Sequence, residues 1–434
     1  MKVGIIGAGA AGLAYELALA GVEVSVYEKA SFVGGQASTF DVESTPLERG
    51  YHHLFTSDTD ILSLMSEIGM SDRMEWHESK VGIFYGGKIF NLVTPLDLLK
   101  FSPLSIIDRI RLGLVTMILK TKKDWKSLEN ETWAGKRVYE VVWGPLLRGK
   151  FGDRHYSEIG MAWFWGKIHT RFASRGKTMA KELLGYPKGS FGEIFDTLKK
   201  KIELMGGSVK LSTGVNKIII EDGKAVGLSL ESDSKQGVTE RFDAILSTTP
   251  SFVFPKLVPK MPKEYEKRLT TVQYMSAVLI ILILDRPLTN VYWLNVADRS
   301  IPFVGVIEHT NMIKSSLYGG KHIVYLSNYL NIDHRLYQMD HNQLLEEYLP
   351  HIKKINPDFE EAWIEKTHYH KVGAAQPIIG INYSQRIPSH KTPFERLYLA
   401  NTTQIYPEDR GTNYLVRMGR EVAKLLLQDY DSSN

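Results

Sequence analysis

Three glycines and one acid near the N-terminus have the types and spacing to hold a dinucleotide. Gly7, Gly9 and Gly12 form a G-x-G-x-x-G pattern, and Glu28 follows shortly afterwards. In such a pattern the first glycine permits a tight turn, the second lets a pyrophosphate approach the backbone, and the third lets a helix pack against a strand. A carboxylate at Glu28 accepts hydrogen bonds from both hydroxyls of an adenosine ribose and repels a 2′-phosphate. These residues therefore predict a dinucleotide site.

A strand, a helix and a second strand must position these residues. Residues 2–6 predict a strand, residues 13–20 a helix of small and apolar side chains, and residues 22–27 a second strand that ends at Glu28. The helix N-terminus then offers unpaired N–H groups and a partial positive charge to the phosphates. The same glycine pattern also occurs in turns that bind nothing, but the flanking elements favour the dinucleotide.

Residues 29–39 (KASFVGGQAST) extend the site with a second glycine pair, Gly34 and Gly35. A plain NAD site does not need this second close approach of the backbone, whereas a flavin that stretches to another domain does. On these residues the sequence resembles the flavoprotein superfamily of amine oxidases, protoporphyrinogen oxidases and phytoene desaturases. The resemblance covers nearly the whole chain and is clearest over residues 2–39, 186–192 and 397–427.

The resemblance implies FAD as the cofactor and an α/β fold. The expected architecture is a Rossmann-like FAD-binding domain of the glutathione-reductase type, joined to an α+β substrate domain with a mixed sheet and a helical insertion. The FAD-binding domain is predicted to comprise residues 1–75, 186–250 and 395–434. The substrate domain is predicted to comprise residues 76–185 and 251–394, of which 95–185 are largely helical.

The resemblance also implies which residues hold the flavin. Val215 would meet the adenine through its main chain, and the final helix, expected over 414–427 with Thr412 or Asn413 as its cap, would direct its dipole at the flavin and stabilise the reduced anion. Gln36 stands where relatives often have arginine, and Asn401 stands where they commonly have Gly-Asp. The full set of predicted FAD-binding residues is Gly7, Gly9, Ala10, Ala11, Gly12, Glu28, Lys29, Gly35, Gln36, Ser38, Gly50, Tyr51, Val215, Thr248, Asn401, Gly411, Asn413, Tyr414 and Val416.

Few residues suggest acid–base chemistry. His52 and His53 follow Gly50 in the stretch ERGYHHLFT, which lies against the flavin ring in relatives. Only one of them can face the ring, and the alternative for each is a structural hydrogen bond. Lys371 precedes the expected loop 373–377 and could act as a base or hold a water. Little such chemistry is required, because a flavin itself accepts hydride.

Composition excludes several classes of protein. The 434 residues are sufficient for two or three domains, and the net charge of +4 is far from that of a nucleic-acid-binding protein. The absence of cysteine excludes disulfides, iron–sulfur clusters and cysteinyl–flavin bonds. No metal site is predicted. Without a signal peptide or a spanning apolar run of roughly 18 residues, a soluble, cytoplasmic protein is expected.

Residues 95–120 leave two interpretations open. Apolar side chains at helical spacing alternate with basic ones, so the segment is either a buried helix pair or a peripheral membrane contact with basic residues toward the headgroups. Relatives with isoprenoid or tetrapyrrole substrates dock on membranes in this part of the chain. Residues 161–165 (MAWFW) either build a core or line a substrate tunnel. Arginines at 148, 154, 171 and 175 would form an anion pocket if two or three converged.

Three functions follow from these residues. The leading one is an FAD-dependent dehydrogenase or oxidase that moves hydride from an apolar isoprenoid, tetrapyrrole or amine substrate to flavin N5. Its electron acceptor would be oxygen or a quinone, because a second G-x-G-x-x-G unit for NAD(P)H is missing. The second is a redox-neutral enzyme like UDP-galactopyranose mutase, whose G-x-H-x-F-x-T stretch resembles residues 50–56. The third is a flavin-binding protein without turnover. A monomer or homodimer is expected.

Overall fold

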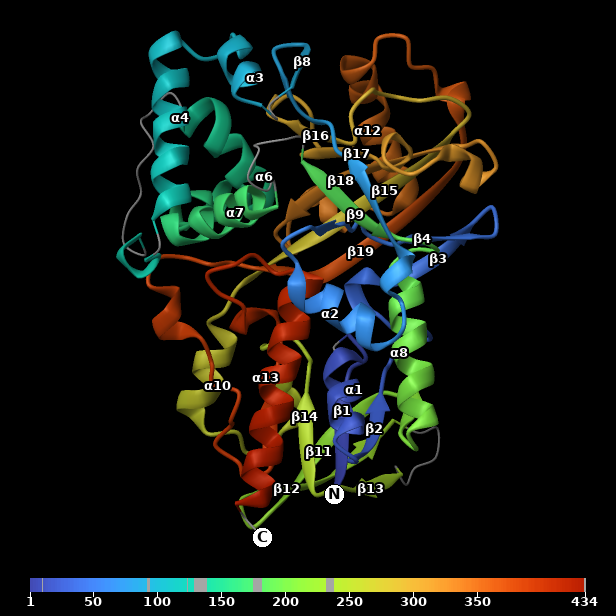
Figure 1. The fold of residues 1–434 in the computed structure, drawn as a ribbon, viewed down its shortest axis with the longest axis vertical. Helices are drawn as coiled ribbons and strands as arrows, with labels where there is room; N and C mark the ends of the chain where they lie inside the picture. The colour runs from blue at the N-terminus through green and yellow to red at the C-terminus, as the bar shows by residue number, and fades with distance from the viewer. Residues whose placement is uncertain are drawn as a thin grey trace.

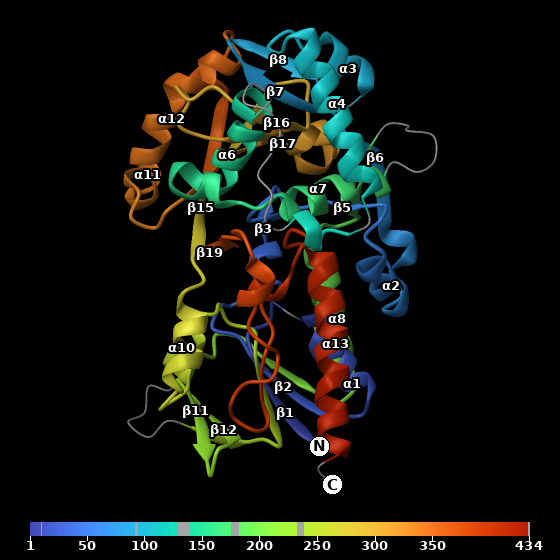
Figure 2. The same ribbon diagram turned by 90° about the vertical axis from the view of Figure 1, so that its left-hand side faces the viewer.

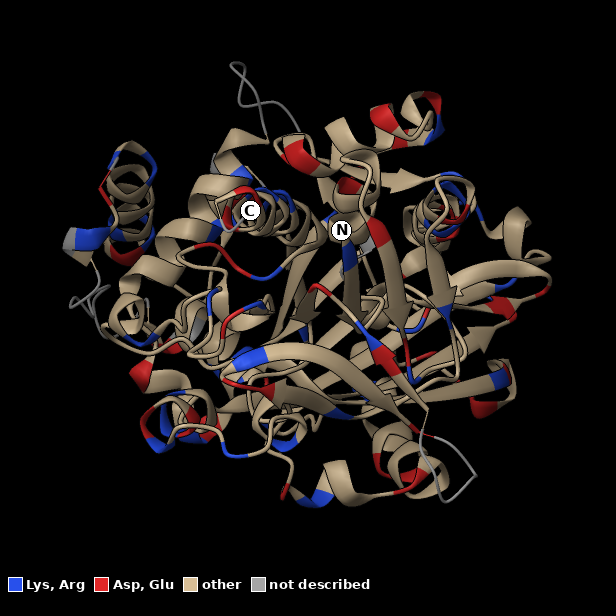
Figure 3. Cartoon of the chain, turned by 90° about the horizontal axis from the view of Figure 1, so that it is seen from below, with Lys and Arg blue, Asp and Glu red and all other residues tan. Residues whose placement is uncertain are grey.

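Two large sheets divide the computed structural model into a lower and an upper half (Figure 1). The structure describes residues 1–9, 11–91, 94–122, 124–128, 139–174, 182–231 and 238–432. Both chain termini lie in the lower half, as the two side views show (Figures 1 and 2). Seen from below (Figure 3), acidic and basic residues are intermixed, in keeping with the small net charge of +4.

The lower half is built on a parallel sheet in the order β10-β2-β1-β14-β20. Helices cover one face, and a three-stranded antiparallel sheet covers the other. The parallel strands are β1 (Lys2–Ile6), β2 (Glu23–Tyr27), β10 (Ser208–Lys210), β14 (Ala244–Ser247) and β20 (Leu397–Leu399). The helices are α1 (Ala11–Leu19), α8 (Gly192–Leu204) and α13 (Thr412–Asp431), and the smaller sheet contains β11 (Val215–Glu221), β12 (Lys224–Leu230) and β13 (Thr239–Arg241).

Side-chain alternation explains why this sheet is buried on both faces. Val3 and Ile5 of β1 pack with the helices, whereas Ile6 packs with the small sheet. Successive residues of a strand point to opposite faces, so a continuous apolar run is needed when both faces are covered. The predicted strands 2–6 and 22–27 and the helix between them are confirmed, with boundaries shifted by one or two residues.

The upper half is built on a mixed seven-stranded sheet, in the order β19-β15-β18-β17-β16-β7-β8. All neighbours are antiparallel except β16 and β7. Helix α12 packs on one face, and the other face points toward the lower half. The bounds are β7 (Val81–Tyr85), β8 (Lys88–Asn91), β15 (Tyr274–Leu284), β16 (Trp293–Val296), β17 (Gly305–Glu308), β18 (His322–Leu330), β19 (Ile364–Pro377), α11 (Arg335–Gln338) and α12 (His341–Ile355).

A group of helices flanks the upper sheet on one side (Figures 1 and 2). They are α3 (Pro95–Lys100), α4 (Ile106–Thr121), α6 (Gly144–His155) and α7 (Met161–Ala173). Shorter elements join the two halves: β3 (Thr39–Val42), β4 (Thr45–Glu48), β5 (Leu54–Phe55), β6 (Met74–Glu78), β9 (Leu183–Pro187), α2 (Thr59–Glu67), α9 (Phe254–Leu257) and α10 (Lys263–Thr270). In the described part of the chain, no helix is long and apolar enough to cross a membrane.

The predicted architecture is confirmed, with two local corrections. The loop expected at 373–377 is strand, because β19 continues to Pro377 and pairs with β15 beyond a bulge. Of the two interpretations of 95–120, the buried helix pair does not hold for much of the apolar surface, since eight apolar side chains of α3 and α4 are exposed, and the membrane contact stays a prediction. The sheets use the expected chain segments, but the division into domains stays a prediction.

Candidate active site

One cavity of about 1320 Å³ runs from the first glycine turn into the upper half. Its wall begins at Gly7 and Gly9, passes Tyr51 and the N-terminus of α13, and reaches Met117 of α4. Fifteen of the predicted FAD-binding residues lie on this wall: Gly7, Gly9, Gly12, Glu28, Lys29, Gly35, Gln36, Tyr51, Val215, Thr248, Asn401, Gly411, Asn413, Tyr414 and Val416. Ala10 lies outside the described residues.

The glycine turn leaves room where a pyrophosphate would lie. A Cβ added at Gly9 would meet no atom within 4 Å, so the cavity wall is open there. Gly7 has a φ of +97°, and a Cβ on it would lie 2.4 Å from Thr248 Oγ1. Thr248 in turn donates to the carbonyl of Ile6 over 2.8 Å and thereby braces the turn. Ala11 begins α1, whose N-terminus faces this turn.

Glu28 is held in place by backbone N–H groups. Ala8 N donates to Glu28 Oε2 and Ala30 N donates to Oε1, each over 2.8 Å. These two bonds fix the carboxylate at the end of β2, where its remaining lone pairs can accept hydroxyl groups. Lys29 beside it forms an exposed ion pair of 2.9 Å with Glu231. The arrangement fits the adenosine ribose of a dinucleotide.

Gln36 is paired with an arginine that sequence reasoning missed. Arg410 Nη1 donates to Gln36 Oε1 over 2.8 Å, and Arg410 Nε donates to Gln376 Oε1 over 3.0 Å. Gln36 and Arg410 lie 374 positions apart in the chain. No local pattern signals a contact of that sequence separation.

The N-terminal cap of α13 differs from the predicted one. Its N-cap is Gly411, without a side-chain capping bond, so the expected cap by Thr412 or Asn413 is wrong. Asn413 Oδ1 instead accepts from the N–H groups of Asp60 and Ile61, over 2.9 and 3.1 Å, and so caps α2. The first residues of α13 line the cavity, where the N–H groups of a helix N-terminus can stabilise negative charge on a ligand.

Three of the predicted FAD-binding residues need separate description. Asn401 lines the cavity, but its amide is already bonded to protein atoms: Nδ2 donates to Thr249 O over 2.8 Å, and Oδ1 accepts from Thr403 N over 3.0 Å. Ser38 and Gly50 are absent from the described lining of the cavity. Ser38 Oγ is buried without a hydrogen-bond partner in the described part of the chain, and the carbonyl of Gly50 accepts from His52.

Both predicted histidines line the cavity, and both are neutral near pH 7. His52 Nδ1 lies 2.6 Å from the carbonyl of Gly50, which can only accept, so this nitrogen carries the proton. His53 Nδ1 lies 3.1 Å from the hydroxyl of Tyr292. Burial lowers the pKa of His52 to about 4 and the pKa of His53 to about 3. Neither imidazole can serve as a cationic acid, and His52 keeps Nε2 as an acceptor.

Lys371 is not brought to the cavity. It pairs across the sheet with Val278, which belongs to the core beneath α12, and its ammonium donates to Met339 O over 2.9 Å. The side chain is exposed on the face of the sheet that carries α11 and α12. The predicted base or water-holding role is therefore wrong in this arrangement, and sequence alone did not settle which face of β19 the lysine occupies.

The upper end of the cavity is apolar and aromatic. Trp163 and Phe164 of the MAWFW stretch are buried, pack edge to face and line the cavity, so the core interpretation is confirmed and the substrate tunnel stays a prediction. Thr170 Oγ1 and Tyr414 OH lie 3.0 Å apart on the same wall. Of the four arginines singled out above, Arg171 lines the cavity and Arg148 lies over the ring of Tyr156 at 4.9 Å. Arg154 contacts Asp333 at the surface, and Arg175 lies outside the described residues.

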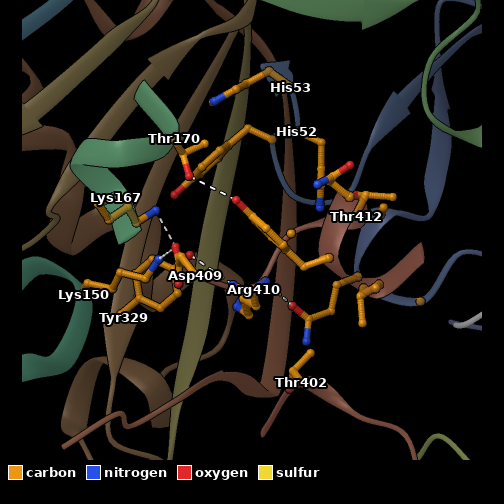
Figure 4. A pocket seen from close by; sticks show the side chains of 18 of the residues that line it. His52, His53, Lys150, Lys167, Thr170, Tyr329, Thr402, Asp409, Arg410 and Thr412 are labelled. Atoms are coloured by element: carbon orange, nitrogen blue, oxygen red, sulfur yellow. Dashed lines mark hydrogen bonds and ion pairs between the residues drawn. The ribbon is translucent and has the colours of Figure 1, made fainter. Parts of the chain in front are cut away.

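Sequence reasoning also missed a cluster of charged residues on the cavity wall. Asp409 forms ion pairs with Lys150 of α6 and Lys167 of α7 (Figure 4). Burial lowers the pKa of Lys167 to about 8. Burial alone would raise the pKa of Asp409, but the two lysines and Arg410 hold it below its usual range. More than two hundred positions separate the aspartate from each lysine, so no sequence motif marks this cluster.

Comparisons with known proteins agree with this geometry. Residues 11–408 match the protein family described as flavin containing amine oxidoreductase. The chain is 23% identical to the mitochondrial protoporphyrinogen oxidase of Nicotiana tabacum over 57% of its own length and 58% of that enzyme's. It is 24% identical to the 15-cis-phytoene desaturase of Synechococcus elongatus over 67% of each chain. The match with the tobacco enzyme thus spans less than two thirds of that protein.

A solved structure of reduced UDP-galactopyranose mutase shares the fold. The TM-score is 0.74 and the alignment covers 98% of this chain and 95% of the mutase, at 15% sequence identity. The structural similarity shows a common fold, and at this low sequence identity it does not identify the reaction.

Proposed function

The chain belongs to the flavin-containing amine oxidoreductases, and from that premise we propose that it is an FAD-dependent dehydrogenase or oxidase acting on an apolar substrate. The family supports FAD as the cofactor and oxidoreduction as the reaction class. The finer steps of the proposal are that the substrate loses hydride from carbon, that it is isoprenoid, tetrapyrrole or amine in type, and that oxygen or a quinone accepts the electrons.

The observation that carries the proposal is the continuity of the cavity. Its lower end has the glycine turn, Glu28 and the start of α13, which suit a dinucleotide, and its upper end has aromatic and aliphatic walls, which suit an apolar substrate. A shared cavity lets the reacting carbon and the flavin ring meet without bulk water.

The residues of the chain have mainly positioning roles in this proposal. FAD supplies the hydride acceptor when it is bound. Gly9, Gly35 and Glu28 hold the dinucleotide. A Cβ at Gly35 would lie only 3.3 Å from Gly9 Cα, so Gly35 has no room for a side chain, whereas a side chain at Gly9 would extend into the open cavity. Tyr51, which packs on Trp293 at 4.8 Å, and neutral His52 line the cavity where its two ends meet.

We place the entrance for an apolar substrate beside α3 and α4. The eight exposed aliphatic side chains of these helices are Leu96, Leu99, Ile106, Ile107, Ile110, Leu114, Met117 and Ile118. Met117 both belongs to this exposed set and lines the cavity. Such a face suits contact with a membrane surface, from which an apolar substrate would enter without crossing water.

The experiment that tests the proposal is anaerobic reduction of the flavin in the purified holoprotein. Candidate substrates, namely a polyene, a porphyrinogen and an apolar amine, are mixed with the protein in the absence of oxygen. We expect one class to bleach the visible absorbance of the bound flavin, and oxygen or a quinone to restore it. If all three classes leave the flavin oxidised, the proposed function is wrong.

The second candidate is a redox-neutral enzyme acting on a nucleotide sugar. The stretch GYHHLFT at residues 50–56 and the shared fold with UDP-galactopyranose mutase favour it. In that case turnover of a nucleotide sugar would require prior reduction of the flavin, and none of the three substrate classes would bleach it. A flavin-binding protein without turnover would show neither behaviour.

A further inference from the structure

The cavity wall carries more positive than negative charge around Asp409. Lys150, Lys167, Arg171 and Arg410 line the cavity there, against the single carboxylate of Asp409. The next acid on the wall is Asp58, whose pKa burial raises to about 6 and whose carboxylate accepts from Phe55 N over 2.8 Å. A buried excess of positive charge is costly, because each unmatched ion loses its hydration without a partner.

Asp409 is fully used by its neighbours. Both ammonium groups contact its Oδ2, and the indole Nε1 of Trp163 donates to Oδ1 over 3.4 Å. One lysine would suffice to neutralise the carboxylate and to connect the helices, so the second leaves a net positive charge. The side chain of Lys167 is 37% exposed, compared with 18% for Lys150, which leaves Lys167 the more accessible to a ligand.

The arginine beside the cluster adds to the excess. The three hydrogen bonds that the guanidinium of Arg410 donates go to neutral acceptors, namely Gln36, Gln376 and Tyr329. Figure 4 shows both lysines directed at Asp409, with Arg410 next to it. Lys150 and Lys167 come from α6 and α7 of the upper half, whereas the glycine turn and Glu28 lie in the lower half.

We propose that the ligand of the upper cavity carries an anionic group, a carboxylate or a phosphate, which binds at Lys150, Lys167 and Arg410 while its apolar body lies along the aromatic wall. The inference rests on the proposed function, because that proposal makes the upper cavity the substrate site. Charge-assisted hydrogen bonds to such a group would use the surplus ammonium that Asp409 leaves unmatched. The aromatic wall, with Trp143 and Phe164 in edge-to-face contact at 4.8 Å, suits the apolar part of the ligand.

The test measures binding to the FAD-loaded protein with three probes of equal chain length: octanoate, octyl phosphate and octanol. Calorimetry or the perturbation of the flavin spectrum reports the dissociation constants, and neither needs turnover. We expect at least one anion to bind about tenfold or more tightly than octanol. The stronger of the two anions identifies the group. Equal binding of all three probes would overturn the inference.

Variants locate the site. Lys167→Met should remove most of the preference for the anion and leave octanol binding unchanged, whereas Lys167→Arg should keep the preference. Lys263→Met, on the exposed start of α10, is the matched control and should behave as the wild type. An unchanged preference for the anion in Lys167→Met would contradict the inference. Loss of FAD from this variant would contradict it as well, because the cluster would then belong to the cofactor site.

The probe-binding test of the anion site and the flavin-reduction test of the proposed function can fail independently. If octanoate binds in the charge-dependent way described and no substrate class reduces the flavin, the anion site stands and the proposed reaction falls. If a substrate reduces the flavin and all probes bind alike, the reaction stands and the anion site falls.

Discussion

At Gly9 the absence of a side chain matters because it leaves space for a ligand. A Cβ there would contact no protein atom within 4 Å, so Gly9→Val should fold normally and extend its side chain into the open cavity. We expect FAD affinity to fall about a hundredfold or more, which corresponds to roughly 2.7 kcal/mol. Calorimetric titration of the FAD-free protein measures this change.

Gly373→Val is the matched control for Gly9→Val. Gly373 is an exposed glycine of β19 whose added Cβ would lie 3.8 Å from Tyr337 OH, so valine fits there without strain. This variant should bind FAD as the wild type does. Normal FAD stoichiometry in Gly9→Val would show that the pyrophosphate does not pass this glycine.

Glu48 is a buried carboxyl that should make stability depend on pH. It accepts from the hydroxyl of Tyr186 over 2.8 Å and from Phe191 N over 2.9 Å, and burial raises its pKa from 4.5 to about 7. Between these values the folded protein holds a proton that the unfolded chain has lost. The resulting contribution to stability is complete below pH 4.5 and is lost as the pH rises through 7.

We therefore expect Glu48→Gln, which keeps both hydrogen bonds, to remove this loss. The unfolding free energy of the wild type, relative to the variant, should fall by roughly 3 kcal/mol between pH 4.5 and pH 7.5. Urea unfolding across this range measures the difference. Glu361→Gln, at an exposed position, should follow the wild-type curve. Parallel curves for the wild type and Glu48→Gln would refute the assignment.

Some site residues were predictable from the sequence and others were not. Glu28 was predictable because its role depends on local spacing, and its contact with Ala8 spans only 20 positions. The Arg410–Gln36 pair spans 374 positions, and the pairing of Asp409 with two lysines joins distant helices, so only the folded chain brings them together. Side-chain direction was the other limit, as the placement of Lys371 shows.

At the scale of elements, Asn413 links the last helix to α2. The N-cap of α2, Asp58, uses its carboxylate to accept from Phe55, and Asn413 Oδ1 serves the N–H groups of Asp60 and Ile61 instead. Asn413→Ala should lower the unfolding free energy by about 1–2 kcal/mol, the usual effect of losing a cap. Asn413→Asp retains the acceptor and should restore most of that stability. Urea unfolding of the wild type and the two variants measures these differences. An unchanged unfolding midpoint in Asn413→Ala would contradict the capping role.

The exposed face of α4 gives a second prediction at this scale. Replacing Ile106, Ile107 and Ile110 by serine should reduce co-sedimentation with anionic phospholipid vesicles at least about tenfold, since each buried isoleucine contributes about 1.5–3 kcal/mol. The exposures of the eight aliphatic side chains range from 47% to 72%. Leu204→Ser, at an 86% exposed position on α8, should change nothing. A wild-type protein that ignores vesicles but forms a dimer lost in the triple variant would identify the face as a subunit interface.

Elements were more predictable than their environments. Residues 274–284 read as a buried strand and are β15, because an apolar run with both faces covered has few other solutions. The helices of 95–120 were also expected, but periodicity reports only that a helix has an apolar face. Whether that face meets protein, lipid or another chain depends on the surroundings, which the local pattern does not contain.

At the scale of the whole molecule, the proposed function requires one cavity that is shared by a dinucleotide end and a substrate end. The glycine turn, Glu28 and α13 define the first end, and α4, α6 and α7 define the second. The sequence predicted both sets of elements, but not that a single cavity would connect them, because this depends on how the helical group packs against the two sheets.

A crystal structure of the FAD-loaded protein tests this claim most directly. We expect the adenosine at Glu28, the flavin ring beside Tyr51, His52 and the start of α13, and open space continuing from the ring toward Lys167 and Met117. Density that places the ring outside this cavity, or a protein wall that separates the ring from Lys167 and Met117, would contradict the account.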